Sequence, residues 1–469
     1  MIAPTPNLSL WHHAAGDYVP SPPLCDELKV DVAVVGAGIN GLSSAWHLKR
    51  DDPSVTVALL EQGTVGDGAS GRNNGILTAH LGLTAGPVKA IFGLQRLREL
   101  IEYASEALAY SRTIIREQQF ECDHEARVRG LTIATAEAFV RPLEKEYRFQ
   151  QACGFGDDIG WVSRSELAAL FEGPLLAGEG AIVDGNSDVV NPVKLVREFK
   201  QLAVGAGVAV FERSPVIDIR RCGAGYRAST PGGAVLAEKL VLTTNAYSHA
   251  LPGGVIDPAD QWPIYAHQIA TEPLSDAAWA EVGWSPDYHR VGDTLMPWHW
   301  ARRTPDGRVT FGGARLPVAR ASADREYDQS AFARLTRHLR AFFPTLADAR
   351  VTHRWGGLLS TTFDLLPHIG FIDADRRAVR VTGCWGHGMA LGHLNGDVVS
   401  RLVREEGGGP AEAWFVRRTP RKWPAAPFRF AGMVGVNGGL RATGTLALRQ
   451  AMRTTGSESR RRALAQLLT

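Results

Sequence analysis

The chain of 469 residues is long enough for two or three domains, and its 45% hydrophobic and 21% charged content is typical of a globular protein. No apolar run approaches the about 20 residues that cross a bilayer, and the N-terminus lacks the basic and apolar regions of a secretory signal, so we expect no membrane span. Five scattered cysteines without a CxxC pair, and histidines without metal-ligand spacing, predict a reduced, cytoplasmic protein with no metal site.

The net charge of +2 is distributed unevenly along the chain. From Pro410 to the end there are eleven Arg or Lys against two Glu. A basic tail suits nucleic acid or a membrane surface. Its many apolar residues instead favour a C-terminal extension, residues 406–469, that packs on an acidic body or at a subunit contact. We therefore expect no nucleic-acid partner, and the oligomeric state stays open.

Residues 1–29 are rich in proline and predict an extension that wraps the surface of the next unit. There follow an apolar strand, a glycine turn, a helix and a second strand. In the turn, Gly36 allows the bend, Gly38 lets the backbone approach a pyrophosphate, and Gly41 lets the helix pack on the strand. The helix N-terminus offers N–H groups to phosphates, and Glu61 at the end of the second strand can accept hydrogen bonds from ribose hydroxyls. Together these elements predict dinucleotide binding.

The middle of the chain alternates between helical and strand patterns. Apolar residues from Leu94 to Leu108 recur at three- and four-residue steps, which predicts an amphipathic helix. Asn191-Pro192 then opens a second helix, and residues 239–245 predict a buried strand. Beyond residue 256 the sequence alternates as strands do, and a further helix is expected from Ala331 to Phe343.

A second strand, glycine turn and helix occur near the C-terminal end. The turn contains Gly383, Gly386 and Gly388, and its helix begins near Met389. NAD needs only one pyrophosphate site, so a second turn far along the chain indicates a longer ligand, and FAD is the natural candidate. The positive end of the second helix would face the N1/C2 edge of the flavin, where reduction leaves negative charge.

These motifs resemble the D-amino-acid oxidase-like family of FAD-dependent oxidoreductases, and most of all its gamma-glutamylputrescine oxidase branch. The residues that carry the resemblance appear in family order over roughly residues 8–405. They are Val34 to Gly41 with Glu61, Gly68 to Gly75, Asp184 to Pro192, Thr244 to Tyr247, Pro305 to Gly313, Trp355-Gly356, Thr362 to Gly370, and Gly383 to Gly388.

The resemblance implies an α/β fold with two domains. One is an FAD-binding Rossmann-like domain of the glutathione-reductase type. The other is a substrate domain whose mostly antiparallel sheet covers the flavin. We expect the FAD-binding domain to be assembled from residues 30–85, 173–255 and 350–405, and the substrate domain from residues 86–172 and 256–349.

Carried over position by position, the resemblance also implies the FAD contacts. Those expected at the ADP half are Gly36, Gly38, Ile39, Asn40, Gly41, Glu61 and Gln62, with Val216 at the adenine through its backbone. Those expected from the pyrophosphate toward the ring are Ala69, Ser70, Arg72, Asn73, Asn74, Gly75, Ile76 and Asn245. Those expected at the pyrimidine edge of the ring are Gly383, Gly386, His387, Gly388 and Met389.

The chain departs from the family pattern at four places. Asn74 replaces a glycine of the branch. Gly357 aligns with the cysteine through which sarcosine oxidases bind FAD covalently, so we expect non-covalent FAD. Thr310 aligns with their oxygen-activating lysine, which leaves rapid reaction with oxygen open. The run from His299 to Arg302 replaces Asp-Tyr-Phe-Arg and suggests a changed substrate pocket.

The expected chemistry is oxidation of a C–N bond of an amine or amino acid. Hydride would pass to flavin N5, and the resulting imine would hydrolyse to a carbonyl. An apolar pocket would keep the amine neutral and hold its C–H bond in near-attack geometry. The candidate catalytic residues are His299, Trp300, Arg302, Trp355 and His387, with Tyr265, His267 and Trp298 as further contacts and Arg302 or Arg354 for a substrate carboxylate.

Each candidate has a structural alternative. For the tryptophans the alternative is a place in the core, and for Arg302 it is an ion pair. Cys384 is better explained as a small buried side chain than as a flavin link. Three functions remain open. They are an oxidase with oxygen as acceptor, a dehydrogenase that uses a quinone or an electron-transfer flavoprotein, and a flavin-binding module without turnover.

Overall fold

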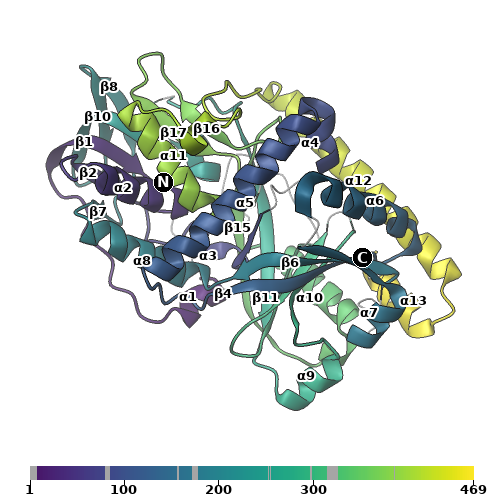
Figure 1. Cartoon of the computed structure of the whole chain (residues 1–469). Coiled ribbons are helices and arrows are strands. Elements are labelled where there is room, and N and C mark those ends of the chain that lie inside the picture. The colour runs from purple at the N-terminus through teal and green to yellow at the C-terminus, as the bar shows by residue number, and fades with distance from the viewer. Residues whose placement is uncertain are drawn as a thin grey trace.

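Two β-sheets organise the fold, one of eight strands and one of nine (Figure 1). The structure is a computed structural model that describes residues 8–79, 85–155, 158–171, 178–251, 253, 255–295, 298–313, 326–384 and 386–468. The first seven residues of the expected N-terminal extension, and residues 80–84, 172–177 and 314–325 of the expected domain segments, therefore lie outside the described residues.

The eight-stranded sheet has a parallel core with helices on one face. Its order is β16-β17-β10-β1-β2-β7, and β17, β10, β1, β2 and β7 run parallel. The bounds are β1 Glu27–Val35, β2 Val57–Leu60, β7 Ala209–Phe211, β8 Asp218–Cys222, β9 Gly225–Ser229, β10 Ala234–Leu242, β16 His368–Phe371 and β17 Ala378–Thr382. The strands are apolar on both sides because helices cover one face and the β8–β9 hairpin packs near the other.

Three helices form the layer on this sheet, namely α2 Ile39–Asp51, α8 Pro192–Gly205 and α11 Gly388–Arg404, and α5, Leu94–Glu117, packs on α11. Each begins where the sequence predicts a helix, and the Asn191 side chain caps α8 by accepting from the Val193 and Lys194 N–H groups. β8 starts at Asp218, after the Ser214 N–H has bonded to the Glu61 carbonyl and directed this stretch across the sheet edge.

The nine-stranded sheet is mostly antiparallel, with a single parallel pair between β4 and β12 among the described strands. Its order is β15-β11-β14-β13-β12-β4-β6-β3, and β5 pairs with β6. The bounds are β3 Ile76–Thr78, β4 Glu125–Ile133, β5 Ile159–Ser163, β6 Gly180–Val189, β11 Trp262–Thr271, β12 Tyr288–Asp293, β13 His299–Arg303, β14 Val309–Gly313 and β15 Val351–Thr361. Helix α10, Gln329–Phe342, packs its apolar side on this sheet.

The expected fold class is confirmed, with a parallel α/β sheet and a second, mostly antiparallel sheet in one chain. The eight-stranded sheet draws its strands from three separated segments. Strands β3, β6 and β15 fall within segments expected in the FAD-binding domain, yet they pair in the nine-stranded sheet. The chain thus passes between the two sheets at these strands, and the domain boundaries stay a prediction.

Shorter helices connect these layers. They are α1 Leu10–Ala14, α3 Ala69–Arg72, α4 Ala85–Phe92, α6 Val140–Gln150, α7 Arg164–Leu170 and α9 Asp276–Val282, with 3-10 helices η1 Glu137–Phe139, η3 Asn245–Ala250, η4 Pro344–Leu346 and η5 Gly409–Glu412. A π-type turn, η2, spans Gln151–Phe155.

The C-terminal extension folds into α12, Ala426–Thr454, and α13, Glu458–Gln466. Several of its cations pair with carboxylates of the body. Arg418 bonds to buried Asp364, and Arg460 Nη2 lies 2.6 Å from Glu179 Oε1. Within the described part of the chain, no helix combines the length and the apolar character needed to span a membrane.

Candidate active site

Both predicted glycine turns open onto one cavity of about 420 Å³, a volume within the range of small-molecule sites. Gly36, with φ of +101°, makes the first turn at the end of β1, and Gly386, with φ of +90°, lies in the second turn just before α11. Positive φ is accessible to glycine without strain. Two segments from opposite ends of the chain therefore face one ligand.

Helices α2 and α11 start at these turns and pack against each other (Figure 1). They approach closely because two glycines of α11 face α2. A Cβ at Gly392 would lie 2.6 Å from Ile39 Cγ2, and one at Gly396 would lie 2.1 Å from Ser43 Oγ. This tight packing fixes the two helix N-termini relative to each other.

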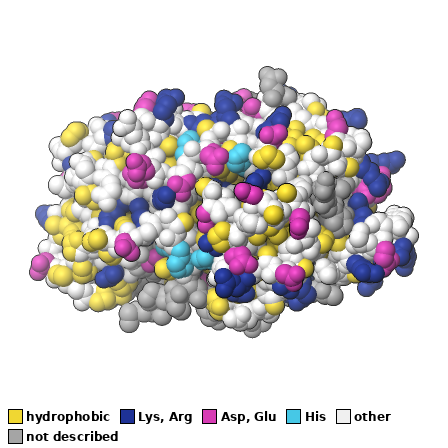
Figure 2. All heavy atoms as spheres, turned by 90° about the horizontal axis from the view of Figure 1, so that it is seen from below, with side chains coloured by type: hydrophobic (Ala, Val, Ile, Leu, Met, Phe, Trp, Pro, Cys, Tyr) yellow, Lys and Arg dark blue, Asp and Glu magenta, His cyan; other side chains and the backbone are white. Residues whose placement is uncertain are grey.

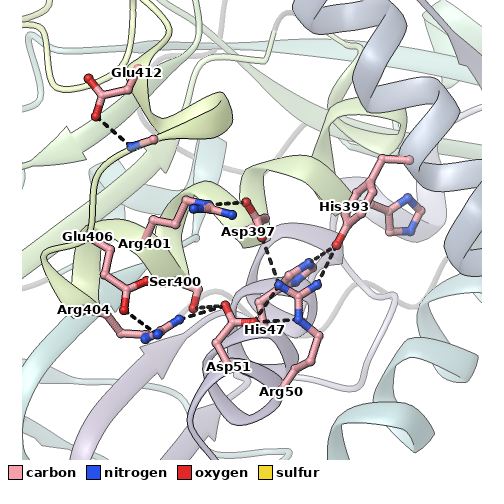
Figure 3. A network of polar contacts seen from close by, with 12 residues as sticks. His47, Arg50, Asp51, His393, Asp397, Ser400, Arg401, Arg404, Glu406 and Glu412 are labelled. Atoms are coloured by element: carbon pink, nitrogen blue, oxygen red, sulfur yellow. Dashed lines mark hydrogen bonds and ion pairs between the residues drawn. The ribbon is translucent and has the colours of Figure 1, made fainter.

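A polar network joins the same two helices farther from the turns (Figure 3). Arg50 Nη2 donates to Asp397 Oδ1 at 3.0 Å, and Ser400 Oγ donates to Asp51 Oδ2 at 2.8 Å. His47 is fully buried beside them, and burial lowers its pKa to about 4, so the ring is neutral at pH 7. The network therefore holds the helix pair at the end opposite the cavity.

The N-terminus of α2 is open toward the cavity. Its N-cap residue is Gly38, which has no side chain to occupy the terminal N–H groups, and Ser70 Oγ accepts only from Ile39 N–H, at 3.0 Å. The positive end of the helix is thus available to an anionic group. Gly41 serves packing instead, because a Cβ there would lie 1.9 Å from Gly36 O.

Glu61 follows β2 at the cavity wall. Its Oε2 accepts from the Ala37 N–H at 2.8 Å and its Oε1 from the Gly63 N–H at 3.0 Å. Burial raises the pKa of the carboxyl to about 7 in spite of these two bonds, and the charges of Asp67 and Glu212 act in the same direction as burial. The ionised carboxylate would gain from further hydroxyl donors inside the cavity.

The carbonyls of residues 72–75 are held by side chains from four distant segments. Trp355 Nε1 and Gln268 Nε2 each donate to the Arg72 carbonyl at 2.9 Å. Trp11 Nε1, from α1, donates to the Asn73 carbonyl at 2.7 Å. Since a buried carbonyl without a donor is costly, these bonds impose one conformation on the loop that forms this wall of the cavity.

Arg302 supplies the fourth set of donors to this loop. Its Nη1 donates to the carbonyls of Asn74, Gly75 and Val190 at 2.9, 3.0 and 2.7 Å, and the ring of Trp11 lies 4.9 Å from its guanidinium carbon. Arg302 makes no ion pair with the residues that the structure describes, and burial lowers its pKa to about 10. It lies behind the wall rather than in it.

The strand period decides which of the other predicted substrate residues reach the cavity. On β13, Trp300 lines the cavity, as does Trp298 just before the strand, whereas His299 points to the opposite side. There His299 Nδ1 lies 2.6 Å from Asp293 Oδ2 and its Nε2 lies 2.8 Å from His338 Nδ1. His299 is therefore a buried structural contact of the nine-stranded sheet.

The same alternation applies to β11. Ile264, Ala266 and Gln268 line the cavity, and Tyr265 and His267 face away from it. Residues of both faces are buried, so the sequence carries no polar–apolar alternation that would distinguish the two sides. Gln268 is consequently a cavity residue that sequence reasoning missed.

The expected FAD contacts fall into two groups. Those that line the cavity are Gly36, Gly38, Ile39, Asn40, Glu61, Gln62, Ala69, Ser70, Arg72, Asn73, Asn74, Ile76, Val216, Asn245, Gly386, His387, Gly388 and Met389. Those that stand behind the wall are Gly41, Gly75 and Gly383, where a Cβ would meet neighbouring atoms at 1.9, 2.2 and 2.4 Å. The second group allows close packing of the backbone that forms the cavity.

Among the expected catalytic residues, Trp300 and His387 line the cavity, whereas His299, Arg302 and Trp355 do not. Thr78 Oγ1 lies 3.1 Å from His387 Nδ1 and orients that ring. Arg354, expected as a possible carboxylate partner, is likewise outside the cavity wall. Further wall residues that the sequence did not indicate include Thr243, Leu358 and Leu359, whose side chains only the fold brings to the cavity.

Three polar atoms of the cavity wall show that it suits a ligand with hydrogen-bonding groups. Asn74 Nδ2, Asn245 Oδ1 and Gln268 Oε1 are buried and have no partner among the described residues. Buried polar atoms are normally paired, so these atoms are positioned for groups of a bound molecule. A cavity with an open helix end, a carboxyl and unpaired amide atoms fits a dinucleotide such as FAD.

Comparison with known proteins agrees with this geometry. The protein-family model described as FAD dependent oxidoreductase (DAO) matches residues 31–402. The chain belongs to this family. The prediction made from the motifs is therefore confirmed, and the chain is an FAD-dependent oxidoreductase, an enzyme rather than a flavin-binding module.

Individual relatives cover most of the chain. It is 28% identical to the "Probable oxidoreductase OrdL" of Haemophilus influenzae, over 81% of this chain and 84% of that protein. It is 27% identical to the "Gamma-glutamylputrescine oxidoreductase" of Escherichia coli, over 84% and 88%, in agreement with the expected branch. The solved structure of glycine oxidase from Geobacillus kaustophilus has the same fold, with a TM-score of 0.69 at 21% identity over 84% of this chain and all of that one.

Proposed function

We propose that the protein oxidises a C–N bond of an amine or amino acid, with FAD bound non-covalently between the two glycine turns and oxygen as the acceptor. The observation that carries the proposal is the convergence of both turns on one cavity whose wall contains amide atoms without a hydrogen-bond partner. The names of two relatives, a gamma-glutamylputrescine oxidoreductase and a glycine oxidase, point to the same substrate class.

Each part of the cavity would hold a different part of FAD. The N-terminus of α2 would face the pyrophosphate, and Glu61 would accept hydrogen bonds from the ribose hydroxyls. The loop of residues 72–75 and the turn before α11 would flank the ring. When bound, FAD would accept at N5 a hydride from the carbon next to the amine nitrogen, which leaves an imine for hydrolysis.

The substrate would bind against an aromatic and aliphatic surface. Trp298 and Trp300 lie in the cavity wall with Ile264 and Leu359. Such a surface disfavours the charged ammonium form by desolvation and so keeps the nitrogen lone pair free. It also excludes water and holds the substrate close to the ring. Arg72 is the one arginine among the described wall residues, and its guanidinium is engaged by the carbonyls of Asp67 and Gly356.

Non-covalent binding is supported by the side chains next to the cavity. Gly357 in the wall has no side chain that could bond to the flavin. Cys384 also lines the cavity, but burial raises the pKa of its thiol, which disfavours the nucleophilic thiolate. We therefore expect acid precipitation to release FAD into the supernatant.

One observation favours a second acceptor. Thr310, where sarcosine oxidases have a lysine, is fully buried, and its Oγ1 donates to Asn74 Oδ1 at 2.7 Å. None of the described wall residues is a lysine. A dehydrogenase that transfers electrons to a quinone or an electron-transfer flavoprotein is therefore the second candidate.

The test is anaerobic reduction of the purified yellow protein by a panel of amines and amino acids, followed by readmission of oxygen. Bleaching near 450 nm with peroxide formation supports the oxidase, and bleaching without peroxide supports the dehydrogenase. A colourless protein that does not take up FAD, or a flavin that no amine bleaches, would contradict the proposal.

A further inference from the structure

Helix α12 lies along the outer edge of the molecule, and no other segment covers its outer side (right edge of Figure 1). At its start, Arg429 Nη1 donates to the Pro258 carbonyl at 2.9 Å, and near its end Leu448 and Ala451 are buried in an apolar cluster that includes α13. Between these anchors it faces outward. Phe428, Val434 and Leu446 expose 74%, 51% and 65% of their surface.

Phe428 and Leu446 share one side of the helix, whereas Val434 lies about 120° around the axis from them. Phe428, Leu446, Arg449 and Arg453 lie 18, 3 and 4 residues apart, and at 3.6 residues per turn all four fall within about 60° of one another around the axis. Ala431, Gly435 and Ala442 occupy the same side and are exposed. The outward stripe is thus apolar or small over most of its length and basic at its C-terminal end.

All the charged side chains of α12 are positive. The helix contains four arginines and no Asp, Glu or Lys. Arg418, Lys422 and Arg460 elsewhere in the extension pair with carboxylates. Arg441, Arg449 and Arg453 form no ion pair within the described part of the chain and are exposed. On the face seen from below, several basic side chains lie at the end of the molecule that carries α12 and α13 (Figure 2).

We propose that α12 docks the enzyme on an anionic phospholipid surface, with Phe428 and Leu446 in the interface and Arg449 and Arg453 against the headgroups. Helices with exposed apolar residues and uncompensated arginines bind in this way without spanning the bilayer. A second copy of the chain is the other possible occupant. A symmetric contact would bring the same arginines together without any acidic residue on α12, so the charge pattern favours lipid.

This inference does not depend on the proposed reaction, because α12 lies outside residues 31–402 that match the family model. The full-length protein with FAD is sedimented with sucrose-loaded vesicles of phosphatidylcholine alone or with 30% phosphatidylglycerol. We expect binding to the anionic vesicles only, weakened strongly between 50 and 500 mM salt. Because each arginine near such a surface contributes about 1 kcal/mol, each Arg→Gln change should weaken partitioning about five-fold.

Two double variants test the electrostatic and the apolar contribution to vesicle binding separately. Arg449→Gln with Arg453→Gln should weaken partitioning about 25-fold by the same per-arginine figure, and Phe428→Ser with Leu446→Ser at least ten-fold. The matched controls are Arg116→Gln with Arg350→Gln, whose side chains are exposed elsewhere, and Val19→Ser, at a residue that is 86% exposed. The controls should leave partitioning unchanged.

Circular dichroism and the flavin absorption spectrum verify that each variant is folded. Vesicle binding that is absent, independent of lipid charge, or equal in the α12 and control variants would overturn the proposal. Analytical ultracentrifugation provides a separate readout. A dimer that the α12 substitutions dissociate, without vesicle binding by the unmodified protein, would assign the helix to a subunit contact instead and would also overturn it.

Discussion

Replacement of Glu61 by glutamine tests how the ADP half of the cavity works. In the apoprotein, burial raises the pKa of this carboxyl from 4.5 to about 7. At 1.36 kcal/mol per unit, ionisation inside the folded protein costs about 3 kcal/mol. Because the folded state prefers the neutral carboxyl, this cost is absent below pH 4.5, develops as the pH rises, and is complete above pH 7.

FAD should reverse this preference. If ribose hydroxyls donate to Glu61, FAD binds the ionised carboxylate more tightly, and its dissociation constant decreases about ten-fold per pH unit below pH 7 and levels off above it. Between pH 5.5 and pH 8 the expected change is about 30-fold. In Glu61→Gln the amide cannot ionise. At pH 8 the dissociation constant for FAD should therefore be larger than that of the unmodified protein, and it should not change with pH.

The measurement is quenching of FAD fluorescence by apoprotein from pH 5.5 to pH 8. Thermal melting of the two apoproteins provides an independent control. The unmodified protein should lose stability relative to Glu61→Gln as the pH rises from 4.5 to 8, because only its carboxyl ionises. A constant offset between the two is expected, since the amide leaves one of the Ala37 and Gly63 N–H donors unpaired. A pH-independent affinity in the unmodified protein, or a 30-fold change that persists in Glu61→Gln, would refute the reasoning.

Three further predictions concern packing, the extension and the substrate surface. Gly41→Ala should abolish the absorption of bound FAD, because its Cβ would lie 1.9 Å from a backbone oxygen. Gly205→Ala, which has open space around it, should keep FAD, and equal absorption spectra of the two variants would contradict this. Asp364→Asn should lower the free energy of unfolding by about 3 kcal/mol, because Arg418 loses a buried ionic partner. Denaturant titration measures this change, and an unchanged midpoint of unfolding would count against the ion pair. Trp300→Ala should raise KM for the best amine about ten-fold, equivalent to about 1.4 kcal/mol, in steady-state assays at saturating acceptor. An unaltered KM would show that Trp300 does not contact the substrate.

Local sequence was sufficient to predict the cofactor half of the protein. The turn at Gly36 and the turn before α11 both depend on backbone conformations and close approaches that glycine permits, so their function is visible in the residue type itself. The strand–turn–helix pattern around each turn is also local. Because cofactor binding here uses backbone and helix ends, residue spacing predicted the elements and the ligand class, and the resemblance of the motifs indicated the family.

Tertiary structure alone decided which side chains of the substrate half face the cavity. β13 and β11 are buried on both faces, so the sequence gives no period that separates Trp300 from His299 or Gln268 from His267. Arg302 looked like a substrate ligand, but three backbone carbonyls and the ring of Trp11 surround it. Those partners come from distant segments, and contacts between distant segments leave no local pattern because only folding brings them together.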